Sequence, residues 1–156
     1  MRLALYQPDI PQNTGTILRL AACLGVAVDV IGPAGFDMTD RCLKRAGLDY
    51  LDHVSLTRFE SFAAFEAARR AHVPVSRLVL LTSHGAASHL DFAYEASDIL
   101  LLGRESAGVP EPVHASVDGR IRIPMEPGLR SLNIAVAAAI VLGEGLRQTG
   151  GFRGQV

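Results

Sequence analysis

The sequence predicts an α/β protein with a single open, mostly parallel sheet and helices on both faces. Short apolar segments alternate with segments of helical periodicity from end to end, which is the pattern of such sheets. Residues 78–81 and 99–102 are apolar throughout, as expected of parallel strands buried on both faces. A length of 156 residues suits one domain. We assign it to residues 1–149 and expect residues 150–156 to form a loose tail.

The first two elements are a strand and a helix joined by a proline-containing loop. Residues 2–6 have the composition of a strand. Asn13 or Thr14 can cap the helix that follows and runs to residue 24. Gly25 then supplies a C-terminal stop.

The next segment predicts a strand and two helices. Residues 26–31 form a β-rich run that a Gly-Pro pair closes. A short helix is expected to begin at Asp37 or Thr39 and to end at Gly47. An amphipathic helix is expected over residues 59–71, where three phenylalanines recur at helical spacing and arginines lie near the C-terminal end.

The second half continues the alternation. Residues 78–81 and 99–102 are buried strands, and residues 119–123 form a shorter last strand flanked by arginines. The final helix, over residues 131–147, is apolar on nearly every side until Glu144. We therefore expect this helix to be buried.

Composition and charge exclude several classes of protein. Hydrophobic residues make up 49% of the chain and charged residues 20%, which excludes intrinsic disorder. The longest apolar run, residues 134–142, is about half as long as a membrane span. With 15 basic and 16 acidic residues, indiscriminate nucleic-acid binding is not expected, although local arginine clusters leave room for a specific site. The N-terminal segment lacks a signal-peptide pattern, and we expect a cytoplasmic protein.

The sequence indicates neither a metal site nor a cysteine nucleophile. The histidines include no HxxxH pair, and Cys23 and Cys42 have no neighbouring cysteine. Two cysteines are also too few for a disulfide framework. Cys23 falls on the apolar side of the first helix, so we expect its thiol to belong to the core.

Two loops that follow predicted strands carry polar residues of interest. The first contains Asn13 and leads to Arg19, which lies among apolar residues of the predicted helix. Such an arginine must either reach solvent or pair with an anion, so a structural ion pair and a functional cation both stay open. The second loop, residues 103–108, holds Glu105 between two glycines but lacks the lysine of a P-loop. Glu105 can pair with Arg19 or Arg130, or it can be only a carboxylate that caps the turn.

A third loop, residues 124–133, leads directly into the final helix. It contains Arg130, Ser131 and Asn133. Ser131 and Asn133 are also ordinary helix caps, and that role alone would explain them. Parallel strands present such loops at one edge of the sheet, where ligands of α/β proteins bind.

The three loops together resemble the three motifs of the SPOUT class of RNA methyltransferases. Three further segments narrow the resemblance: Tyr6-Gln-Pro-Asp-Ile-Pro-Gln-Asn-Thr-Gly15, Arg45-Ala-Gly-Leu-Asp-Tyr50 and Arg122-Ile-Pro-Met125. They are similar to those of the short tRNA wobble-position ribose 2′-O-methyltransferases. The resemblance runs from about residue 3 to residue 149 and is specific in the combination of its motifs.

The resemblance implies an α/β fold with a C-terminal trefoil knot, a homodimer, and S-adenosylmethionine as methyl donor without a metal. It implies cofactor contacts at positions of the second and third motifs and the strand before them: Leu81, Gly103, Ile123, Met125, Ser131 and Leu132. It implies a catalytic group formed by Arg19, Glu105 and Asn133. It implies contacts to the RNA substrate from Asn13 and Arg130.

The expected activity is methylation of the ribose 2′-hydroxyl of the wobble nucleotide, position 34, in the anticodon loop of tRNA. Arginine is a poor general base, so we expect Arg19 to position and polarise that hydroxyl. The same chemistry on another RNA nucleotide, and a module that binds the cofactor or RNA without turnover, are the alternatives. The chain departs from the family pattern at Arg104, where proline is frequent, and near Gly143, where an aromatic residue is frequent.

Overall fold

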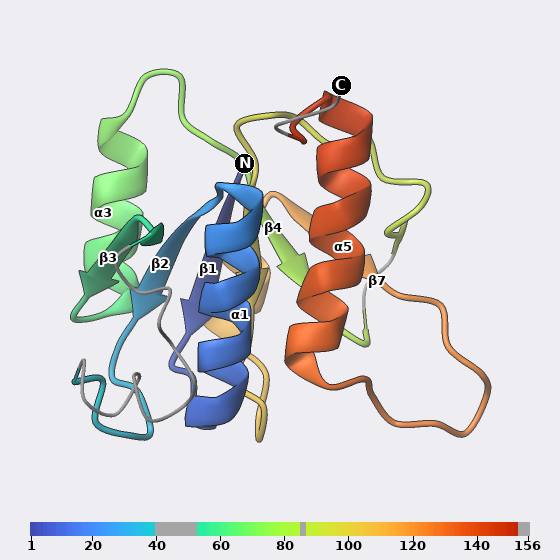
Figure 1. Cartoon of the computed structure of the whole chain (residues 1–156), viewed down its shortest axis with the longest axis horizontal. Helices are drawn as coiled ribbons and strands as arrows, with labels where there is room; N and C mark the ends of the chain where they lie inside the picture. The colour runs from blue at the N-terminus through green and yellow to red at the C-terminus, as the bar shows by residue number, and fades with distance from the viewer. Residues whose placement is uncertain (40–52, 85–86, 153–156) are drawn as a thin grey trace.

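The computed structural model describes residues 1–39, 53–84 and 87–152. Within these residues seven strands form one parallel sheet in the order β3-β2-β1-β6-β4-β7-β5 (Figure 1). The strands are β1 (Arg2–Tyr6), β2 (Ala27–Ile31), β3 (Leu56–Phe59), β4 (Leu78–Leu81), β5 (Ala87–Ser88), β6 (Ile99–Leu102) and β7 (Gly119–Arg122). The α/β class and the single, mostly parallel sheet are confirmed.

Helices cover both faces of this sheet. The helices are α1 (Pro11–Leu24), α3 (Phe62–Ala71), α4 (Glu111–Ser116) and α5 (Ile134–Thr149). Helices α1 and α5 lie side by side on one face, and α3 covers the other (Figure 1). Successive side chains of a strand point to opposite faces, so Leu3 and Leu5 pack beneath α1 and α5, whereas Ala4 packs in the cluster of α3 and α4. This two-sided burial explains why the central strands are apolar without alternation.

Helix α1 begins earlier than predicted. Its N-cap is Ile10 and Pro11 occupies the first helical position, where the fixed φ of proline suits the helix and no N–H is missed. Asn13 and Thr14 are therefore in the first turn, and the prediction that one of them caps the helix is wrong. The predicted stop at Gly25 is confirmed, with φ at +65°.

Helix α3 begins later than predicted. Phe59 is the last residue of β3, and Ser61 caps α3 by accepting a hydrogen bond from the Ala64 N–H at 3.2 Å. The predicted helix over residues 59–71 is therefore wrong at its start. Phe59 still packs edge-on against Phe65, at 5.4 Å between ring centroids, which explains why the three phenylalanines look like one helical face.

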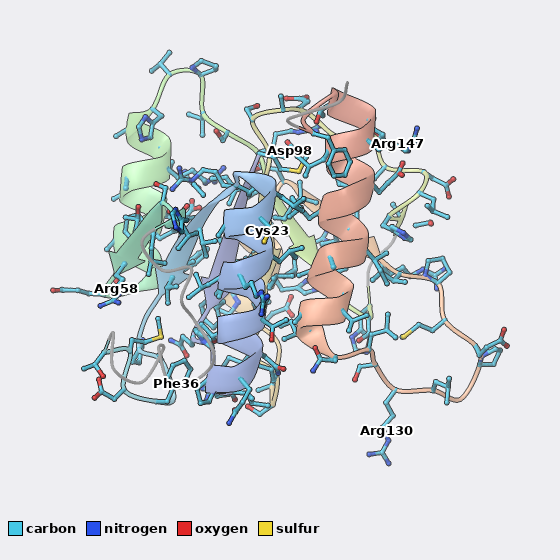
Figure 2. The ribbon with its side chains drawn as sticks, in the orientation of Figure 1. Cys23, Phe36, Arg58, Asp98, Arg130 and Arg147 are labelled. Atoms are coloured by element: carbon cyan, nitrogen blue, oxygen red, sulfur yellow. The ribbon has the colours of Figure 1, made fainter. Side chains whose placement is uncertain are left out.

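The final helix is buried on one side only. Asn133 caps α5 by accepting hydrogen bonds from the N–H groups of Ala135 and Val136. Val136 is 50% exposed and Ile140 is 38% exposed, so the prediction of an entirely buried helix is wrong. Cys23 of α1 is exposed as well, contrary to the expected core position (Figure 2).

Several predicted features lie partly or wholly outside the described residues. These are most of the helix expected between Asp37 and Gly47, the segment 45–50, Cys42, and residues 153–156 of the expected tail. Phe152, at the start of that tail, packs against the core beside α1 and α5. In the described ranges no helix has the length and apolar character needed to cross a membrane.

Candidate active site

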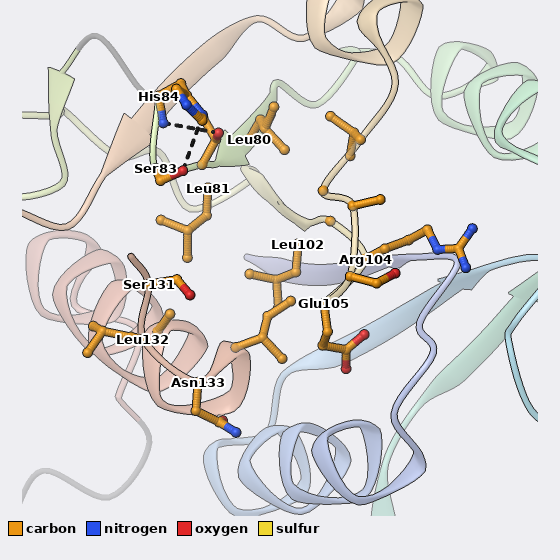
Figure 3. A pocket seen from close by; sticks show the side chains of 18 of the residues that line it. Leu80, Leu81, Ser83, His84, Leu102, Arg104, Glu105, Ser131, Leu132 and Asn133 are labelled. Carbon is orange, nitrogen blue, oxygen red and sulfur yellow. Dashed lines mark hydrogen bonds between the residues drawn. The ribbon is translucent and has the colours of Figure 1, made fainter. Parts of the chain in front are cut away.

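A cavity of about 720 Å³ lies at the carboxyl ends of β4, β6 and β7 (Figure 3). The register pairs Leu81 with Leu102 and with Ile121, so the loops after these strands start at the same edge of the sheet. The volume is in the range of small-molecule sites, and the location is where open α/β sheets bind ligands. Nine of the eleven site residues expected from the sequence line it: Asn13, Leu81, Gly103, Glu105, Ile123, Met125, Ser131, Leu132 and Asn133.

The glycine loop, residues 103–108, forms one wall of the cavity. Arg104 and Gly108 exchange two backbone hydrogen bonds of 2.8 Å, which close the base of the loop. A Cβ on Gly103 would lie 2.7 Å from the carbonyl carbon of Gly108. Gly108 has φ at +64°, a conformation that favours glycine. Both glycines are therefore required by the closed shape of this loop.

A chain of hydrogen bonds runs from the glycine loop to the start of α5. Asn133 Oδ1 caps the helix, so its Nδ2 faces Asn13 and donates to Asn13 Oδ1 at 2.9 Å. Asn13 Nδ2 in turn donates to Glu105 Oε1 at 3.3 Å. The helix cap thus determines the orientation of both amides, and the carboxyl group of Glu105 is the terminal acceptor.

The partners of Glu105 differ from those expected. In the described part of the chain it accepts hydrogen bonds from Asn13 and from the backbone N–H of Asp9, rather than pairing with Arg19 or Arg130. Burial raises the pKa of Glu105, and the neighbouring Asp9 carboxyl raises it further. Glu105 therefore keeps its proton to a higher pH than an exposed glutamate.

The two arginines expected in the site do not line this cavity. Arg19 is exposed on α1, so its predicted position within the apolar face is wrong. At 100° per residue it shares the outer face with Thr16 and Cys23. Arg130 is exposed on the loop between β7 and α5 and points away from the body of the molecule (Figure 2).

Residues 1–143 match the model of the SpoU rRNA Methylase family. The chain belongs to the SpoU methylase family. This confirms the family resemblance of the three sequence motifs.

Relatives of this SpoU methylase extend over nearly the whole chain. A protein of Ancylobacter novellus is 57% identical over 97% of this chain and 95% of its own length. One of Beijerinckia indica is 60% identical over 95% and 91%, and one of Escherichia coli K12 is 38% identical over 96% and 94%. All three are named tRNA (cytidine(34)-2′-O)-methyltransferase.

Solved structures agree with this assignment. A structure concerned with 2-OH methylation of C/U34 on tRNA is 44% identical, covers 94% of both chains and has a TM-score of 0.87. The SpoU methyltransferase AviRb of Streptomyces viridochromogenes, in complex with AdoMet, is 32% identical with a TM-score of 0.83. The match covers 95% of this chain and 60% of AviRb.

Sequence reasoning missed several residues of the SpoU methylase cavity. Ser83, His84 and His114 line it, and Ser83 Oγ lies 3.2 Å from His84 Nδ1 (Figure 3). Ser83 and His84 follow β4 directly, so the carboxyl-end rule for parallel strands would have found them. Among the described residues no cluster of three His, Cys, Asp or Glu side chains could hold a metal ion.

Proposed function

We propose that this SpoU methylase transfers a methyl group to the ribose 2′-hydroxyl of nucleotide 34 of tRNA, a cytidine or a modified uridine. The observation that carries the proposal is the cavity, where residues of three separate motifs line one volume. Relatives named for this reaction, 57% and 60% identical over nearly the full chain, support it. A nucleotide of a single-stranded loop can be turned out of its stack, and its 2′-hydroxyl marks it as RNA.

We propose that the cavity binds S-adenosylmethionine, which when bound supplies an electrophilic methyl group on a sulfonium. The residues fit such a ligand because the closed glycine loop lines one wall of the cavity, and at Gly108 a Cβ would point into open space that glycine leaves empty. Leu81, Ile123 and Leu132 provide apolar walls, while backbone groups of the loops offer hydrogen bonds to a polar ligand. We place Met125 and Ser131 in the same contact set.

The residues of the chain must make the 2′-hydroxyl nucleophilic and hold it in line with the methyl group. A guanidinium favours a developing alkoxide, and we assign this role to Arg19, with an RNA phosphate as proton acceptor. Glu105 and Asn133, joined through Asn13, orient the site; Asn13 and Arg130 contact the RNA. This division follows the hydrogen-bonded chain and assigns the exposed side chains of Arg19 and Arg130 to the phosphate-rich substrate.

We propose that the active form is a homodimer, because the site of one chain leaves Arg19 outside the cavity. Arg19 follows Asn13 by six residues and so points about 240° around the helix from it. The exposed apolar side chains of Val136 and Ile140 lie on the neighbouring helix α5. A second copy docked on this face would bury them and place Arg19 in the interface.

We propose that residues 1–149 form the methyltransferase unit and that its C-terminal part is knotted as in the SPOUT class. The TM-score of 0.87 to a related structure over 94% of both chains supports this fold. We propose a cytoplasmic location because the proposed substrate is a tRNA.

The test is a methylation assay with labelled S-adenosylmethionine and total tRNA, followed by nuclease digestion and mass spectrometry. We expect a 2′-O-methyl group at nucleotide 34 that is lost with Arg19→Ala. Arg70→Ala serves as a matched control because Arg70 is an exposed arginine of α3, on the opposite face of the sheet. A mark at another nucleotide, or bound cofactor without any methylated tRNA, would overturn the proposal in favour of one of the alternatives.

A further inference from the structure

Asp9 joins the loop after β1 to the apex of the glycine loop. Its backbone N–H donates to Glu105 Oε2 at 3.1 Å, and the Glu105 N–H donates to Asp9 Oδ1 at 3.2 Å. The Ser106 hydroxyl donates to Asp9 Oδ2. The guanidinium of Arg104 lies 3.6 Å from the same oxygen. Three consecutive residues of the glycine loop are thus held by one aspartate.

The base and the apex of the glycine loop are held by different interactions. The base is closed by the backbone bonds between Arg104 and Gly108. The apex, Glu105 and Ser106, is held by Asp9 and Asn13. Loss of the Asp9 carboxylate would therefore free the Glu105 N–H and the Ser106 hydroxyl at the apex, while the base stays closed.

The position of Asp9 is itself constrained by a neighbouring glycine. A Cβ on Gly35 would lie 2.8 Å from Asp9 Cβ and 3.0 Å from its Cα. The Gly35 N–H also donates to the Pro8 carbonyl at 2.9 Å. The loop after β2 thus packs tightly behind Asp9, which reduces the freedom of its carboxylate.

The two carboxyl groups have opposite tendencies to ionise. Hydrogen bonding with the Glu105 side chain and with Ser106 lowers the pKa of Asp9 to about 2, and the charge of Arg104 acts in the same direction. Asp9 therefore loses its proton at a lower pH than Glu105, and its carboxylate accepts from Ser106 and from the backbone of Glu105.

We infer that Asp9 is a positioning residue, whose carboxylate holds the apex of the glycine loop so that Glu105 faces Asn13. It acts through Glu105 and does not line the cavity. The inference rests on the proposed methyl transfer, because Glu105 matters for turnover only if the cavity is the site of that reaction. Asp9, together with its hydrogen-bond donor Ser106, thus positions Glu105 for the reaction.

The test compares wild type with Asp9→Ala and Asp9→Asn on tRNA, with Asp91→Asn, an exposed aspartate after β5, as matched control. We expect Asp9→Ala to lower kcat roughly 10- to 100-fold, as loss of a residue that orients a catalytic group does. The Kd for S-adenosylmethionine and the KM for tRNA should change less than roughly threefold, because the base of the loop stays closed. Asp9→Asn, which keeps one acceptor oxygen, should lie between the two.

A double-mutant cycle separates positioning from a general structural effect. In the Glu105→Gln background, Asp9→Ala should lower kcat by much less than in wild type, because the residue through which it acts is already altered. An equal loss in both backgrounds, or unchanged kcat in Asp9→Ala, would overturn the inference while wild-type activity upholds the proposed function.

Hydrogen exchange tests the role of Asp9 even if the protein does not methylate tRNA. Amide hydrogen exchange of Glu105 and Ser106 should be faster in Asp9→Ala than in wild type and unchanged in Asp91→Asn. Cooperative thermal unfolding would show that all three proteins are folded. If wild type does not methylate tRNA, the proposed function fails. Unchanged exchange at the apex would then refute the inference separately.

Discussion

Asn133 performs two tasks with the two ends of one amide. Its Oδ1 caps α5 and its Nδ2 donates to Asn13. Asn133→Asp keeps the acceptor and removes the donor, so we expect nearly unchanged stability and roughly tenfold lower kcat. Asn133→Ala removes both and should also lose about 1 kcal/mol of unfolding free energy. Thermal unfolding and tRNA methylation rates measure the two effects separately.

The matched control for this prediction is another helix cap. Ser61 caps α3 through the Ala64 N–H and does not line the cavity. Ser61→Ala should cost about 1 kcal/mol as well, but leave kcat unchanged. Loss of activity in Ser61→Ala, or full activity in Asn133→Asp, would show that the hydrogen bond to Asn13 does not matter.

Asp9 and Glu105 predict opposite trends of stability with pH. The pKa of Asp9 falls from 3.8 to about 2 on folding, so its contribution is present above about pH 4 and is lost as pH falls towards 2. The pKa of Glu105 is raised on folding, so its contribution is present at low pH and is lost as pH rises through the folded-state value.

Urea unfolding at pH 5 and pH 2.5 tests this assignment. Asp9→Asn should lose less stability on acidification than wild type, because one group that must take up a proton has been removed. Asp91→Asn should lose as much stability between pH 5 and pH 2.5 as wild type, since Asp91 is exposed and away from this pair. Identical acid profiles of Asp9→Asn and wild type would contradict the lowered pKa of Asp9.

At the scale of elements, the strands that form the centre of the sheet were predictable from sequence. The segments that form β1, β4 and β6 are apolar because both faces of the sheet are covered there, so their composition alone predicts buried strands. Strands β3 and β5 were missed because they are edge strands of four and two residues. Their pairing comes from neighbours distant in sequence, which no local pattern reports.

The candidate site was predictable where a polar residue lies in a loop that follows a predicted strand. Asn13, Glu105 and Asn133 each follow a predicted strand, and the structure brings them together. The position of Arg19 was predicted wrongly because its neighbours in sequence are apolar. Successive side chains of a helix point about 100° apart, so Arg19 can be exposed while those neighbours are buried. The role of Asp9 depends on a contact across 96 residues of sequence, which spacing cannot reveal.

The glycine loop predicts different outcomes for two Gly→Ala substitutions. In Gly103→Ala the Cβ would meet the backbone of Gly108 at 2.7 Å, so the loop must open; we expect the Kd for S-adenosylmethionine to rise at least roughly tenfold. A Cβ on Gly143 of α5 would meet open space, and Gly143→Ala should stabilise the helix by up to about 1 kcal/mol. Calorimetric titration and thermal unfolding distinguish them, and equal cofactor affinities would contradict the required closed loop.

The exposed face of α5 predicts where the chain associates. Ile140→Asp places a charge among apolar side chains that a second copy would bury, and we expect it to give a monomer by sedimentation velocity. Val73→Asp is the matched control, since Val73 is 94% exposed on the turn after α3, away from this face. A wild-type monomer, or an unchanged dimer in Ile140→Asp, would exclude this face as the interface.

At the scale of the whole molecule, the separation of Arg19 from its own cavity predicts a site shared between two chains. Arg19 points about 240° around α1 from Asn13, so we expect it to serve the cavity of the partner. We expect Arg19→Ala and Asn133→Asp each to be weakly active or inactive alone. In a mixture, a heterodimer has one cavity with intact Asn133 facing an intact Arg19.

Co-expression of the two variants with different affinity tags therefore restores activity if Arg19 acts across the interface. Random pairing gives half heterodimers with one working site each, or roughly a quarter of the wild-type sites. If Arg19 instead acts within its own chain, every site of every dimer carries one defect and no activity returns. Doubly tagged heterodimers purified in sequence should reach roughly half the wild-type rate per dimer; their inactivity would place Arg19 on its own cavity.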